Sequence, residues 1–125
     1  MEYLRKVDFA ALAAAGAQGR LTQGLLDADS GAKECTINCV QVPPGGGSPA
    51  GRHTHVFEQI YYIVSGTMDV EIGGQQFRAG PGTLIYLPPG VPHRNWNGGA
   101  EPVVHLAMMV PSPTPGEPMA IPVPD

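Results

Sequence analysis

Short runs of apolar residues, bounded by glycine, proline or polar turn residues, recur along most of the chain. They predict β-strands at residues 20–28, 35–42, 53–64, 67–72, 75–78, 83–87 and 102–110. One short helix is predicted, at residues 8–15 (DFAALAAA), with Asp8 as its cap and Gly16 as its stop. Gly73–Gly74 predicts a hairpin turn. Short strands at this spacing favour an all-β fold, either a sandwich or a barrel.

Composition supports the all-β prediction. The 17 glycines and 14 prolines make up a quarter of the 125 residues, and both residue types destabilise helix interiors. A disordered chain would combine low hydrophobicity with high net charge, whereas here 42% of residues are hydrophobic and the net charge is −4. The length favours a single domain over residues 1–125.

Two segments are too rich in proline and glycine for regular strands. Residues 43–51 (PPGGGSPAG) are predicted to form a loop. Residues 111–125 hold six prolines and are expected to run extended. This tail either frays or forms a clasp, along the barrel or onto a second subunit.

The charge balance argues against several partners. The chain has seven basic and eleven acidic residues, so it lacks the excess of positive charge that is typical of proteins that bind nucleic acid or an anionic membrane. The first ten residues lack the apolar core of a signal peptide, and no apolar stretch approaches the ~20 residues that span a bilayer. A cytoplasmic protein is therefore expected.

The four histidines carry the candidate chemistry. His53 and His55 are two residues apart, so on a strand both imidazoles point to one face and form half of a transition-metal site. If the strand is unbroken, Gln59 lies on that same face and Glu58 on the other. A β-bulge between residues 55 and 59 would reverse this assignment.

Two spaced motifs resemble those of the cupin family. The first comprises Gly47, His53, His55, Gln59 and Gly66, with Gln where the family usually has Glu. The second comprises Gly82, Pro88, Gly90, His93 and Asn97 without departure. The resemblance covers residues 47–97 and implies a jelly-roll β-barrel. It also implies one divalent metal ion held by His53, His55, residue 59 and His93, and commonly a homodimer.

Such a ligand set has chemical consequences. Three imidazoles and an amide oxygen leave one or two coordination positions open, which is typical of catalytic metal sites. Zn, Fe, Ni, Mn, Co and Cu all accept these ligands. Neutral Gln59 leaves the full charge of the ion, which favours anionic oxygens such as enolates, phenolates or carboxylates and strengthens Lewis acidity.

Several further residues are candidates for the site. His105 is either a core histidine or a fifth ligand or general base, and Tyr61 shares the ligand face and could move a proton. Four further residues are either core residues or part of a substrate pocket: Phe57, Tyr86, Trp96 and Met109. Met109 is four residues after His105, so on a strand the two side chains point to the same face. Arg52, Arg78 and Arg94 could anchor a carboxylate at the mouth.

The first functional hypothesis is a Lewis-acid enzyme of cyclase, isomerase or lyase type, acting on a small oxygen-chelating substrate. It follows the resemblance to small single-domain cupins of the polyketide-cyclase or uronate-processing kind. The second is an Fe- or Cu-dependent dioxygenase, and the third is a non-catalytic cupin that binds a small molecule.

Overall fold

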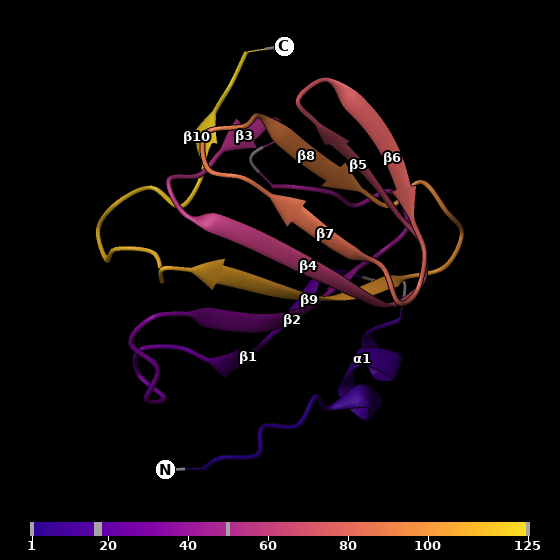
Figure 1. The fold of residues 1–125 in the computed structure, drawn as a ribbon. Helices are drawn as coiled ribbons and strands as arrows, with labels where there is room; N and C mark the ends of the chain where they lie inside the picture. The colour runs from indigo at the N-terminus through magenta and orange to yellow at the C-terminus, as the bar shows by residue number, and fades with distance from the viewer. Residues whose placement is uncertain (1, 17–18, 50, 125) are drawn as a thin grey trace.

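The computed structural model describes residues 2–16, 19–49 and 51–124, which form two antiparallel five-stranded sheets (Figure 1). Sheet A has the order β1-β2-β9-β4-β7, and sheet B has the order β10-β3-β8-β5-β6. The elements are α1 (Phe9–Ala15), β1 (Leu21–Leu26), β2 (Thr36–Val42), β3 (His53–Thr54), β4 (Glu58–Ser65), β5 (Met68–Ile72), β6 (Gln75–Ala79), β7 (Leu84–Leu87), β8 (His93–Trp96), β9 (Val103–Val110) and β10 (Ile121–Pro122). The predicted jelly-roll, with one short helix, is confirmed.

The hydrophobic core lies between the two sheets. It joins inward residues of sheet A, such as Ile63 and Leu87, to those of sheet B, such as Met68 and Val70. Burial follows the two-residue period of the strands, so the polar residues that share these inward positions are also enclosed. The site described below is built from these enclosed polar side chains.

The helix covers part of the other face of sheet A. Leu12 of α1 packs on Cys39 of β2 and Val104 of β9 in a second, smaller cluster. Asp8 caps the helix by accepting a hydrogen bond from the backbone N–H of Ala11 at 3.0 Å. The helix thereby shields the outer side of the strands that flank the barrel interior, and the interior side remains free for the site. Within the described ranges, no helix has the length and apolarity needed to cross a membrane.

The predicted strand at residues 53–64 is interrupted. It forms β3 and β4, and residues 55–57 lie between them. The alternation nevertheless continues across the break, because His55, Phe57 and Gln59 are buried whereas Val56 and Glu58 are exposed. Gln59 therefore lies on the same side of the chain as His53 and His55, despite the interruption.

The proline-rich tail returns to the barrel. Ile121 and Pro122 form β10 and pair with Thr54 and His53 of β3. The backbone N–H of Val123 also donates to the Arg52 carbonyl oxygen at 3.0 Å. The described part of the tail thus runs as a clasp along the chain's own sheet B.

A motif glycine lets the loop before β3 approach β8 closely. A Cβ atom on Gly47 would lie 2.7 Å from the Asn95 carbonyl oxygen, which is too close for any other residue. Gly47 forms a β-bridge with Trp96, and the next residue, Ser48, donates its backbone N–H to the same Asn95 carbonyl at 2.8 Å. This contact fixes the loop beside the strand that carries His93.

Candidate metal centre

Three buried histidines converge inside the barrel. His53 and His93 are paired residues of β3 and β8, and His55 follows β3 immediately. One ring nitrogen of each lies within 4.8 Å of the others, and their ring centroids are 4.5–4.9 Å apart. We call these residues the three-histidine cluster, and its geometry fits a single metal ion.

Backbone carbonyls set the tautomer of all three rings. The Nδ1 atom of His53 donates to the Gly51 carbonyl at 2.5 Å, and that of His93 donates to the Val91 carbonyl at 3.0 Å. The Nδ1 atom of His55 donates to the Met119 carbonyl. Since a carbonyl oxygen only accepts, the proton of each neutral ring is on Nδ1 and the Nε2 lone pair is free.

The free lone pairs face one another. The Nε2 atoms of His53 and His55 are 3.1 Å apart, although neither carries a proton to donate. The Nε2 atom of His93 and the Oε1 atom of Gln59 are buried without a hydrogen-bond partner among the described residues. Buried acceptors that lack donors are costly, and a shared cation would satisfy them. The donor set of imidazole nitrogens suits a divalent transition metal.

Burial favours the neutral form of His55 and His93, which is the form that binds metals. The pKa of His93 is lowered to about 4, chiefly by burial and to a lesser extent by the neighbouring His53 and His55, while the hydrogen bond to the Val91 carbonyl opposes the shift. Burial also lowers the pKa of His55, while its hydrogen bond to the Met119 carbonyl opposes that shift. The cluster is therefore ready to act as a ligand set near neutral pH.

Glu58 and Tyr86 lie on the outside of the barrel. The Tyr86 hydroxyl donates to the Glu58 carboxylate, and the Tyr86 side chain is 46% exposed. Strand parity explains this, because Tyr86 pairs with Ile60 on the face opposite Gln59 and Tyr61. Tyr86, which the sequence offered either as a core residue or as part of a pocket lining, is thus not brought to the three-histidine cluster.

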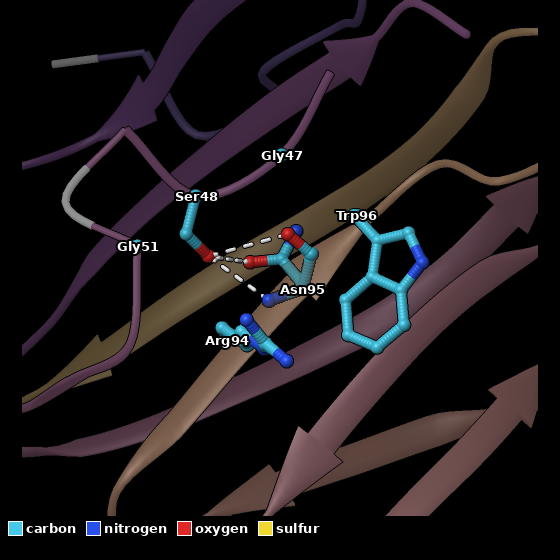
Figure 2. Close-up of a pocket in the computed structure, with 6 residues that line it drawn as sticks. All are labelled: Gly47, Ser48, Gly51, Arg94, Asn95 and Trp96. Carbon is cyan, nitrogen blue, oxygen red and sulfur yellow. Dashed lines mark hydrogen bonds between the residues drawn. The ribbon is translucent and has the colours of Figure 1, made fainter. Parts of the chain in front are cut away.

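Trp96 also faces outward. On β8 the inward residues are His93 and Asn95, so Arg94 and Trp96 point away from the cluster. The Arg94 guanidinium carbon lies 5.4 Å from the Trp96 ring centroid, and both line a shallow outer pocket (Figure 2). Figure 2 also shows the Ser48 hydroxyl beside Asn95, with Ser48 Oγ 2.5 Å from Asn95 Oδ1. Trp96 is therefore separated from the cluster by its own strand.

A cavity of about 350 Å³ adjoins the three-histidine cluster. Gln59 and Tyr61, both named from the sequence, line this cavity. Phe57 stacks on the His55 ring with centroids 4.6 Å apart, and Met109 is buried opposite Gln59. The lining comprises Arg20, Ser48, Pro49, His53, His55, Gln59, Tyr61, Asn95, Met119 and Ala120. We call this space the interior cavity, and its volume suits a small organic molecule.

Tyr61 and His105 form a second titratable pair beside the cluster. Their ring centroids are 4.6 Å apart, and His105 is 1% exposed with no partner for Nδ1 among the residues described. Burial, and then the charge of Arg20, lower the pKa of His105 to about 4. Burial raises the pKa of Tyr61 to about 12. The pair therefore consists of a neutral imidazole and a protonated phenol.

Sequence reasoning missed Arg20 and the tail residue Met119. Arg20 lines the interior cavity and donates to the Gly47 carbonyl at 3.1 Å. Neither residue belongs to a motif or shares a strand with the histidines, so no spacing in the sequence signals them. The three arginines named from the sequence instead pair with acids: Arg52 and Arg94 with Glu71, and Arg78 with Asp69.

Comparisons with known proteins agree with the fold. Residues 38–109 match the cupin domain family. The polyketide cyclase RemF from Streptomyces resistomycificus aligns with a TM-score of 0.72 and 26% identity, over 86% of this chain and 73% of that one. A Thermus thermophilus protein, TT1209, gives a TM-score of 0.72 and 22% identity, over 88% of this chain and 100% of that one. A predicted oxalate decarboxylase from Thermotoga maritima aligns with a TM-score of 0.67 and 23% identity, over 74% of this chain and 81% of that one.

A curated relative in Methanocaldococcus jannaschii, an uncharacterised protein, is 33% identical over 70 residues. That match covers 56% of this chain and 55% of the relative, so the chain spans about half the length of that protein.

Proposed function

The chain belongs to the cupin domain family, and we propose that it is a metal-dependent enzyme acting as a Lewis acid on a small oxygen-chelating substrate. The reaction would be of cyclase, isomerase or lyase type. One observation carries the proposal: three Nε2 lone pairs converge beside a cavity that no carboxylate lines among the described residues. The resemblance to RemF, a polyketide cyclase, supports the cyclase option.

The ligands would come from both sheets. His53, His55 and His93 would hold the ion through Nε2, and Gln59 would add its unpartnered Oε1. When bound, a divalent ion would supply Lewis acidity that polarises a carbonyl or enol oxygen of the substrate. The neutral amide of Gln59 would not reduce that polarising power as a carboxylate does.

The chain's own residues would handle the proton. Tyr61 lines the cavity and keeps its proton at Oη, because its pKa is about 12, so it can donate a hydrogen bond to a substrate oxygen. His105 lies against Tyr61 as a neutral imidazole whose Nδ1 can accept a proton. His105 lies outside the three-histidine cluster, which favours a proton-handling role over that of a fifth ligand.

The test is metal-dependent turnover without oxygen. Chelator-treated protein would be reloaded with Zn, Ni, Co or Fe(II) and incubated anaerobically with β-diketones, 2-hydroxyaryl ketones and uronic acids, with products followed by mass spectrometry. We expect turnover with Zn or Ni, loss of turnover in His93→Ala, and unchanged turnover in the outward-facing control Tyr86→Phe.

Three outcomes would contradict the proposal. Turnover that consumes oxygen and requires Fe(II) would indicate a dioxygenase. Stoichiometric metal without turnover of any member of the panel would indicate a binding protein. Activity that appears only in Gln59→Glu would show that the neutral ligand is not suited to the reaction.

We further propose that the protein is a homodimer. Tyr62, Leu84 and Tyr86 are exposed on the outer face of β4 and β7, beside the strands that α1 covers. A second copy of the chain would bury this apolar face. Sedimentation equilibrium should give twice the chain mass for the wild type and the chain mass for Leu84→Glu, whereas a monomeric wild type would contradict the dimer.

A further inference from the structure

Arg20 supplies the cationic side chain of the interior cavity. It lies just before β1 and reaches the cavity wall, where one guanidinium nitrogen, Nη1, donates to the Gly47 carbonyl. A guanidinium has five N–H donors in a planar fork, so this single bond leaves most of them available. Its position at the wall makes it the group that a ligand entering the cavity would meet.

No acid of the described chain balances this charge. Arg52, Arg78 and Arg94 each lie within 4.0 Å of a carboxylate, but Arg20 does not. The other residues that line the cavity are neutral, including Gln59 at the position where a carboxylate is usual. With a divalent ion on the histidines, the cavity would hold three positive charges and no negative one.

We propose that the substrate carries a carboxylate that Arg20 binds at the cavity wall, and a second oxygen donor that meets the metal centre. The substrate class is therefore an anionic hydroxy- or oxo-carboxylic acid rather than a neutral polyol or ketone. This inference rests on the proposed function, since the second oxygen needs the metal centre. Arg20 is then the residue that selects for the acid.

Two further observations agree with this assignment. Arg20 is an exposed residue, and its charge still acts on the proton-handling pair: it opposes the burial that raises the pKa of Tyr61 and adds to the burial that lowers the pKa of His105. A carboxylate held bidentately by a guanidinium is fixed in orientation as well as in position. The ligand's second oxygen would thus be presented to the histidines from one side.

The test compares two probes of the same shape. Salicylate carries a carboxylate beside a phenol oxygen, and salicylamide replaces only the carboxylate by a neutral amide. Binding of both to the Zn-loaded protein would be measured by isothermal titration calorimetry, with zinc content checked by elemental analysis. The wild type should bind salicylate at least tenfold more tightly than salicylamide.

Variants then locate the preference. Arg20→Met should weaken salicylate binding at least tenfold and change salicylamide binding less than threefold, and Arg20→Lys should restore part of the loss. Arg78→Met removes an arginine that pairs with Asp69 outside the cavity, so it should behave as wild type. Equal salicylate affinities in the wild type and Arg20→Met would overturn the inference.

The metal-free protein separates this inference from the proposed function. If the histidines bind no zinc, the proposed function fails, and the chelator-treated protein should still bind salicylate in an Arg20-dependent way. If zinc binds but Arg20→Met changes nothing, the metal centre stands and the assignment of Arg20 is wrong.

Discussion

The Nδ1 atom of His55 donates its hydrogen bond to the backbone carbonyl of Met119, a residue 64 positions further along the chain. The bond holds the proton on Nδ1 and leaves Nε2 free for the cluster. Two backbone contacts place the carbonyl: β10 pairs with β3, and Val123 bonds to Arg52. The tail is thus part of the structure that orients a residue of the candidate metal centre.

Removal of residues 119–125 should weaken zinc binding by roughly 10–100-fold, because His55 loses its orienting acceptor. Competition with a chromophoric chelator measures the affinity. A shorter deletion of residues 124–125 keeps the contacts of Met119, Ile121 and Val123 and should bind zinc as the wild type does. Equal affinity in both deletions would mean that the tail has no role in positioning His55.

Gln59 and Glu58 should differ in their effect on the metal. Gln59→Ala should lower zinc affinity about tenfold or more, since it removes an unpartnered Oε1 that faces the cluster. Glu58→Ala should leave the affinity unchanged, because its carboxylate bonds to Tyr86 on the outer face. The same chelator competition distinguishes them, and a loss confined to Glu58→Ala would contradict the observed orientation.

His105 should make the metal-free protein less stable in mild acid. Its pKa is about 4 in the fold and 6.5 ordinarily, so between these values the unfolded chain binds more protons and stability rises with pH. The stability associated with the neutral form of His105 is fully present above pH 6.5 and is lost as the pH falls to about 4. The difference between the two pKa values corresponds to about 3 kcal/mol in the free energy of unfolding.

Urea unfolding from pH 4 to pH 7.5 would measure this dependence. His105→Gln, which stays neutral throughout, should show a shallower fall in the free energy of unfolding. Tyr61, which lies against His105, stays protonated over this range and adds no titration of its own. Parallel pH profiles for the wild type and His105→Gln would contradict the prediction.

Gly66→Ala should destabilise the fold by more than about 2 kcal/mol. Gly66 has φ of 78°, and an added Cβ would lie against the Pro102 carbonyl oxygen. Gly74→Ala is the matched control, since Gly74 has φ of 84° but open space around its Cβ position, and it should lose about 1 kcal/mol. Equal losses in thermal or urea unfolding would show that the contact with Pro102 has no cost.

Several features could be predicted from local spacing. Short strands and turn glycines predict an all-β sandwich or barrel, and the resemblance of two motifs to those of cupins implies the jelly-roll. The shared face of residues 53–64 follows from the two-residue period. That period assigned Gln59 to the histidine side even though the strand breaks between residues 54 and 58. The two-residue period could not place Tyr86 and Trp96, because the sequence alone did not say which face of β7 and β8 points inward.

The sequence by itself thus determined the family, the all-β class and the histidines that face one another, because these depend on spacings within a strand or a motif. Only the tertiary structure decided that Arg20 reaches the cavity, that Met119 orients His55, and that Tyr61 lies against His105. These contacts join segments that are far apart in the chain. They depend on the order of strands in two sheets and on the course of loops, which no local period encodes.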